Sequence, residues 1–194
     1  MPYILGTEFK NIAFCATGCL LALELQRGKE GMQSQRHCAE LGATAACTLR
    51  LMVEVHKDNS QAGAGLPVDA WFGSMKAAVA LAKEGYKAVL QVKTGNGLFP
   101  KKFIEDTLKD APGGVWIVLE AIHDNVPLIV IGYSYSKRTM LLFVATKNAG
   151  STKKGNPYNM KYTDDWGNVH VHEVDHPDII SNFFEHSNMI GKHN

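Results

Sequence analysis

The sequence has no long apolar segment and almost no excess charge. No apolar run reaches the ~20 residues that a transmembrane helix needs. The stretch from Met1 to Glu8 has neither the basic region nor the long apolar region of a signal peptide. We therefore expect an intracellular protein with no membrane partner. The formal net charge is +1, which argues against the strong overall basicity of a free-standing nucleic-acid-binding domain.

Cysteine is scarce as well, and the sequence contains no CxxC pair. In an intracellular chain of this size, such spacing favours buried thiols over disulfides or a zinc site. The four cysteines are Cys15, Cys19, Cys38 and Cys47.

The composition is that of a globular protein. Hydrophobic residues make up 45% of the chain and charged residues 20%, a balance that supports a core. The 194 residues are enough for one ordinary domain, or for one domain with an insertion. There is no internal repeat and no low-complexity segment.

The first half of the chain alternates between strand-like and helix-like patterns. Two apolar stretches on either side of Gly18 predict a β-hairpin over residues 12–26. Apolar residues at helical spacing predict one helix over about 39–55. Serine often begins a helix and glycine often ends one, so Ser74 and Gly85 predict a helix that starts after Ser74 and runs to Lys83. The short apolar stretch at 66–73 predicts a short strand that ends at Asp69, and we expect a second strand at 88–93 and a short helix at 101–109.

The second half is dominated by strand-like runs. Those at 115–122, 127–135 and 140–145 are joined by short polar turns, which predicts an antiparallel meander. Residues 150–167 are polar and typical of a loop, 169–174 predict another strand, and Pro177 predicts the start of a final helix over 178–189. The order of elements predicts an α/β fold of the α+β kind, with helices packed on a mixed sheet and a β-rich insertion at about 112–175.

Basic residues are concentrated in one part of the chain. Between Lys93 and Lys161 there are ten basic residues and five acids. Ordinary solvated lysines and a phosphate-binding surface are both consistent with this excess. As nucleic-acid-binding candidates we take Lys93, Lys101 and Lys102.

Three histidines near the end of the chain introduce the alternative of a metal site. His170 and His172 would share one face of the strand at 169–174, and His176 follows closely. Zinc needs three or four ligands in tetrahedral array, and no cysteine lies nearby. We therefore favour an exposed edge strand.

Asp69 is the residue placed best for chemistry. It stands at the end of a short strand and just before a helix, where α/β folds build their sites. A single aspartate in a turn is also a common cap or Asx turn. The string Asp-Ala-Trp-Phe-Gly-Ser at 69–74, the regions at 92–94 and 99–101, and the ending at 190–194 together resemble the piggyBac-type transposase domain.

That resemblance covers nearly the whole chain and implies an RNase H-like core in a single domain over 1–194, as a fragment of a longer ancestral protein. Transposases of this family cut and join DNA with three aspartates that hold two divalent metal ions. The second aspartate matches Asp69. The first position reads Ala16, within the run from Cys15 to Gly18, and the third reads Gly191, within the ending from Ile190 to Asn194.

Loss of two carboxylates has a direct physical consequence. A two-metal centre needs several carboxylate oxygens to clamp ions about 3.5–4 Å apart. Alanine and glycine supply no side-chain ligand, so we expect no cofactor, and Mg²⁺ or Mn²⁺ only if other carboxylates rebuild the site. Substitute ligands would have to come from Glu24 or from the later aspartates Asp164, Asp165, Asp175 and Asp178.

Three functional alternatives follow. The first is a catalytically inactive, transposase-derived domain that binds DNA or another partner, including a second copy of itself. The second is an active metal-dependent nuclease or transposase that uses substitute carboxylates such as Glu24. The third is a relic without function. The resemblance implies a nuclear location, although the sequence has no compact basic run that would mark one.

Overall fold

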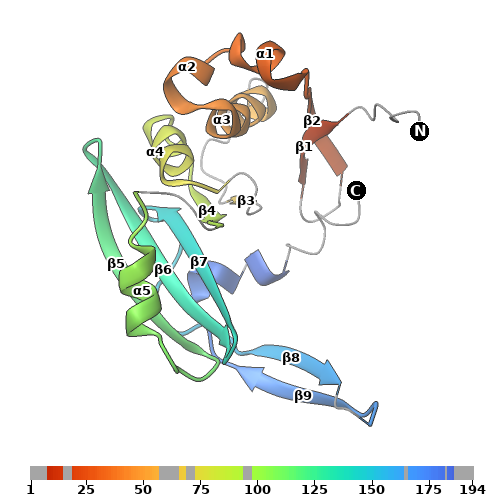
Figure 1. The fold of residues 1–194 in the computed structure, drawn as a ribbon, viewed down its shortest axis with the longest axis vertical. Helices are drawn as coiled ribbons and strands as arrows, with labels where there is room; N and C mark the ends of the chain where they lie inside the picture. The colour runs from red at the N-terminus through yellow and green to blue at the C-terminus, as the bar shows by residue number, and fades with distance from the viewer. Residues whose placement is uncertain are drawn as a thin grey trace.

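A computed structural model of the chain describes residues 8–14, 19–56, 66–68, 73–93, 98–163, 166–181 and 183–185. In these ranges the strands form a two-stranded hairpin, a five-stranded sheet and a second two-stranded ribbon (Figure 1). None of the described helices is long and apolar enough to cross a membrane. The fold is α+β with a mixed central sheet, as the sequence predicts.

The predicted N-terminal hairpin is present. β1 (Phe9–Phe14) and β2 (Cys19–Leu25) pair antiparallel. A short helix that the sequence did not predict, α1 (Gly28–Gln33), follows them. The helix expected over 39–55 is divided into α2 (Cys38–Leu41) and α3 (Ala43–His56). The break falls at Gly42, whose φ of 80° lies in the left-handed region that glycine adopts without strain.

The central sheet has the strand order β3-β4-β7-β6-β5. β3 (Leu66–Val68) is parallel to β4 (Ala88–Gln91), and every other neighbouring pair is antiparallel. The predicted meander corresponds to β5 (Val115–His123), β6 (Val126–Ser136) and β7 (Thr139–Thr146). These three strands, which fall within the predicted β-rich insertion, continue the sheet of β3 and β4, because β7 pairs directly with β4.

Serine and glycine delimit the helix that links the parallel strands. α4 (Met75–Lys83) begins after Ser74, whose Oγ accepts a hydrogen bond from the backbone N–H of Ala77 at 3.1 Å. Gly85 ends it with a φ of 81°. Both boundary residues act as the sequence predicts, since the N-cap and the C-terminal glycine each satisfy local backbone requirements.

Alternate residues of the sheet face two separate apolar cores. Leu90, Val130 and Val144 belong to the core on the side of α3, α4 and α5 (Lys101–Thr107). Their neighbours Ile131 and Phe143 belong to the second core, which includes the C-terminal residues Ile180 and Phe183. The period of two along each strand produces this division. The central strands β4, β6 and β7 are therefore covered on both faces.

The segment expected to be a polar loop over 150–167 contains a strand. β8 (Tyr158–Thr163) pairs antiparallel with β9 (Val169–Val174), and the two form a ribbon that extends from the body (Figure 1). Most side chains along it are exposed. Apolar patterning could not predict β8, because its cross-strand pairing, and not burial, holds it. The final helix begins as a 3₁₀ turn, Asp178–Ile180, and is described only to Glu185.

Candidate functional site

The candidate site lies at the edge of the central sheet where the parallel strands end. β3 ends at Val68, and Asp69 is the next residue in the chain. The neighbouring parallel strand β4 ends at Gln91. Carboxyl ends of parallel strands meet at one edge of a sheet, which is where open α/β sheets bind ligands.

Gly73 lies against that edge of the sheet. A Cβ atom added at Gly73 would lie 1.7 Å from the carbonyl oxygen of Gln91, so no other residue fits there without movement of the backbone. Lys93 follows β4 at the same edge and is exposed. The described residues therefore place Gly73, the start of α4 and Lys93 around the end of β4.

The three metal positions of the sequence analysis, Ala16, Asp69 and Gly191, lie outside the described residues, as do the candidate ligands Asp164 and Asp165. Among the residues that the structure does describe, no three His, Cys, Asp or Glu side chains are grouped so that they could hold a metal ion.

Glu24 is engaged by an arginine. Its two carboxylate oxygens accept hydrogen bonds from Nε and Nη2 of Arg50 at 2.8 and 2.6 Å. The two side chains are only 18% and 14% exposed. Arg50 also donates to the carbonyl oxygen of Arg36 and to Cys38 Sγ. The hydrogen bonds that Arg50 donates to Glu24 outweigh desolvation and raise the pKa of Arg50. A carboxylate held in this way is a poor metal ligand, because ligation would leave Arg50 without its counter-charge.

Two of the four thiols are buried, as predicted. Cys47 lies beneath the same ion pair, where burial and then the charge of Glu24 raise its pKa to about 12. Cys38 is also buried, but Cys19 is exposed on β2, contrary to the expectation of a buried thiol. Cys15 lies outside the described residues.

The three histidines are separated by their surroundings. His170 and His172 are exposed on the ribbon, which agrees with the predicted exposed strand. His176 is 4% exposed, and its Nε2 lies 3.0 Å from Ser181 Oγ. Burial lowers the pKa of His176. A backbone hydrogen bond at Val174 and the negative charges of Asp178 and Asp175 act in the opposite direction but are smaller. Burial of His176 therefore serves the packing of the C-terminal segment.

The candidate lysines on α5 share their surroundings with acids. Lys101 Nζ lies 3.3 Å from Glu105 Oε1 one turn later, and Lys102 is exposed. Residues 101–110 carry three lysines and three acids, so this segment has no net charge.

More of the basic excess lies in two other segments, the β6–β7 turn and the segment that follows β7. Lys137 and Arg138 form its turn, and Lys153 and Lys154 follow β7; all four are exposed. Of these, Lys154 is paired with Asp175 at 2.7 Å. We call these four residues the hairpin basic cluster.

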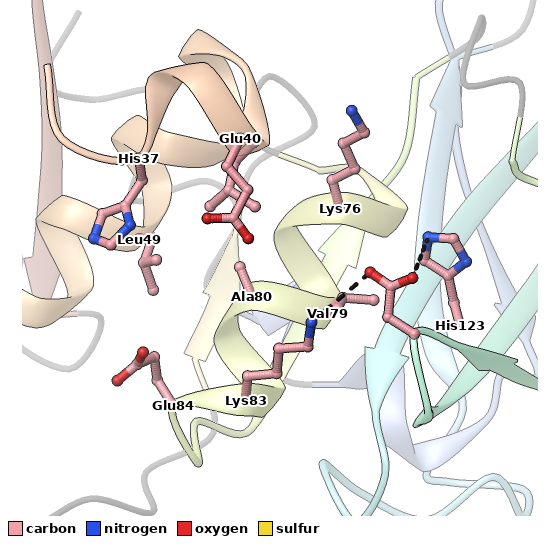
Figure 2. Close-up of a pocket in the computed structure, with 11 residues that line it drawn as sticks. His37, Glu40, Leu49, Lys76, Val79, Ala80, Lys83, Glu84 and His123 are labelled. Atoms are coloured by element: carbon pink, nitrogen blue, oxygen red, sulfur yellow. Dashed lines mark ion pairs between the residues drawn. The ribbon is translucent and has the colours of Figure 1, made fainter. Parts of the chain in front are cut away.

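A groove lies beside α4. Its volume is about 230 Å³, and it is lined by residues of α2, α3, α4 and the β5–β6 turn (Figure 2). Lys83 Nζ lies 3.8 Å and His123 Nε2 4.0 Å from the carboxylate of Asp124. Lys76, Glu40 and Glu84 add charges of both signs. This mixture defines no single ligand. The sequence alone could not indicate this groove, because its residues come from distant segments and share no local pattern.

Comparison with known proteins gives one structural likeness. No protein-family model matches the chain, and no curated protein matches it by sequence. A solved cryo-EM structure of a piggyBac transposase synaptic complex with hairpin DNA is similar over 96% of this chain, with a TM-score of 0.61 and 14% identity. The chain spans 33% of the length of that transposase chain. At this identity the likeness is one of fold, and the chain has a piggyBac-like fold.

Proposed function

We propose that the chain is a transposase-derived domain with an RNase H-like core that binds DNA and has lost the cleavage chemistry. One combined observation carries the proposal. The fold is similar to a piggyBac transposase over 96% of the chain, and the sequence has alanine and glycine where the resemblance implies two of three metal-binding aspartates. The fold supports descent from a transposase, and the substitutions support loss of activity.

The residues do not fit the pair of divalent ions that the resemblance implies. Ala16 and Gly191 have no side-chain oxygen, which leaves Asp69 alone. Magnesium is usually bound through one or two carboxylates together with waters and phosphates, so one aspartate could hold one ion weakly, but it cannot form a two-metal clamp. The best-placed substitute, Glu24, is held by Arg50. The chain therefore lacks the ligands that two-metal cleavage of DNA requires.

DNA is the partner that the fold supports, because the similar transposase is a DNA-bound complex. Basic side chains could contact phosphates at two places. The first is the sheet edge with Lys93, together with Lys101 and Lys102 on α5; the second is the hairpin basic cluster. The acids on α5 cancel its lysines, so we expect the hairpin basic cluster to contribute more. A nuclear location belongs to the same proposal, because the resemblance to transposases implies it.

Metal binding separates the inactive domain from the active alternative. We would titrate Mn²⁺ into the purified chain by calorimetry and compare wild type with Asp69→Ala, with the exposed Asp106→Ala as the matched control. The expected result is weak binding or none, with no dependence on Asp69. Tight binding of about two ions per chain that Asp69→Ala abolishes, followed by metal-dependent strand cleavage, would refute the loss of activity.

DNA binding is tested separately. Fluorescence anisotropy with a labelled duplex would be followed over a range of salt concentrations for wild type and two triple variants. In one, Lys137, Arg138 and Lys153 become Gln; in the other, Lys93, Lys101 and Lys102 do. Each lost phosphate contact reduces the salt slope by about 0.9. We expect the first variant to lose more affinity and slope than the second. Absence of binding by the folded wild-type chain at low salt would contradict the proposal.

A further inference from the structure

Strand β5 forms one edge of the central sheet, and its own sequence lacks the residues that usually protect an edge strand. In the part of the chain that the structure describes, its only strand partner is β6. Its nine residues contain no proline and no lysine, and Glu120 is the only acid. Ile122 is 79% exposed and Val115 38% exposed. A long apolar edge strand presents a row of backbone groups that another strand can pair with.

We propose that two copies of the chain associate by antiparallel pairing of their β5 strands across a two-fold axis, which joins the two central sheets into one. The inference does not depend on DNA binding or on the proposed function. Figure 1 shows β5 at an outer margin of the molecule, beyond β6. A two-fold axis makes such an interface closed and self-complementary, so association stops at the dimer.

Geometry restricts the register of this pairing. Along β5, backbone groups point alternately toward β6 and toward the outer edge. In an antiparallel pair, two residues opposite each other direct their backbone N–H and C=O groups either both toward the partner strand or both away from it. In two identical strands, residues can therefore face each other only when both numbers are odd or both are even. The symmetric pairings are therefore centred on a residue, and centring on Leu119 alone pairs all nine residues.

Charge and side-chain contacts favour the same register. Centring on Glu120 would set two carboxylates directly opposite each other, which destabilises a sheet. Centring on Leu119 sets Glu120 opposite Val118. It also sets the exposed Ile122 opposite Trp116, an aromatic and β-branched pair of the kind that stabilises sheets.

The size of the interface indicates a weak dimer. Nine residues extend about 31 Å, and a sheet with its side chains is about 10 Å thick, so each edge covers roughly 300 Å². A standard interface buries about 800 Å² per partner. The pairing would make about eight to ten backbone hydrogen bonds, comparable to a standard interface. Hydrogen bonds at this edge, and not buried area, would hold the dimer, so we expect it to depend on concentration.

Cross-linking tests the register. Two cysteines at position 119 would have Cβ atoms about 4.5–5.5 Å apart, at the upper limit of disulfide reach, whereas those at position 122 would lie about 20 Å apart. We would oxidise Leu119→Cys and Ile122→Cys, each in a Cys15→Ser, Cys19→Ser background. The expected result is a cross-linked dimer for Leu119→Cys only. Equal or stronger cross-linking of the more exposed Ile122→Cys would mean random collision and would overturn the proposal.

Sedimentation tests the interface without a new thiol. We expect wild type to show a monomer–dimer equilibrium and Ile122→Lys to raise the dissociation constant at least tenfold. Since Ile122 is 79% exposed, this variant should keep the thermal stability of the monomer. The matched control is Val169→Lys, at a residue 65% exposed on β9, which should dimerise as wild type does. A monomer at every concentration, or a dimer that Ile122→Lys leaves unchanged, would overturn the proposal.

Discussion

Replacement of Glu24 by glutamine distinguishes a structural carboxylate from a metal ligand. Glu24→Gln keeps the size and shape of the side chain but removes the charge that faces Arg50. In the native chain, two short hydrogen bonds of 2.6 and 2.8 Å join the pair, and both side chains are more than four-fifths buried. Arg50 would keep its hydrogen bonds to Arg36 and Cys38, but its charge would have no carboxylate counter-ion.

The expected cost follows from these contacts. Removal of one partner from a fully buried ion pair costs about 3–5 kcal/mol. Glutamine can still accept one hydrogen bond from Arg50, and the site of Glu24 is partly solvated. We therefore expect Glu24→Gln to lower the free energy of unfolding by about 2–3 kcal/mol. This value corresponds to the loss of one hydrogen bond to a charged group together with part of the desolvation penalty of Arg50.

Urea denaturation followed by tryptophan fluorescence measures this cost. The midpoint should fall while the slope stays constant, since the same surface is exposed on unfolding. Glu105→Gln is the matched control, because Glu105 pairs with Lys101 at 3.3 Å on the surface of α5. Exposed pairs of this spacing contribute about 0.3–0.5 kcal/mol. If Glu24→Gln costs no more than Glu105→Gln and also abolishes Mn²⁺ binding, Glu24 is a metal ligand and the argument from the ion pair is wrong.

Three other predictions concern the sheet edge, the C-terminal segment and the thiols. Gly73→Ala should destabilise the chain, as shown by a lower melting temperature, because the added Cβ would lie 1.7 Å from the carbonyl oxygen of Gln91; an unchanged melting temperature would contradict this close approach. Burial lowers the pKa of His176, so the unfolded chain takes up its proton first and stability should fall as the pH drops below about 6.5. Urea titrations at several pH values should show a flatter profile for His176→Gln. Cys47, with a pKa raised to about 12, should react with an aromatic disulfide at pH 8 only after unfolding, whereas the exposed Cys19 should react at once.

The absence of ligand atoms at two of the three metal positions could be predicted from residue types. The surroundings of the candidate substitute ligands could not. The sequence by itself identifies Ala16 and Gly191 as residues without a ligand atom. It could not show that Glu24 is taken by Arg50, because the two residues are 26 positions apart and meet only when β2 packs on α3. The surroundings of Asp69 itself lie outside the described residues.

The sequence determined the elements whose signals are local. Ser74 and Gly85 delimit α4 because capping is decided within one turn of helix, and apolar runs with polar turns between them predict the meander of β5, β6 and β7. Tertiary structure alone decided the pairing of β4 with β7, the strand β8 and the burial of His176. Each depends on contacts between segments far apart in the chain, and residue type and periodicity do not specify which distant strand or helix a segment will meet.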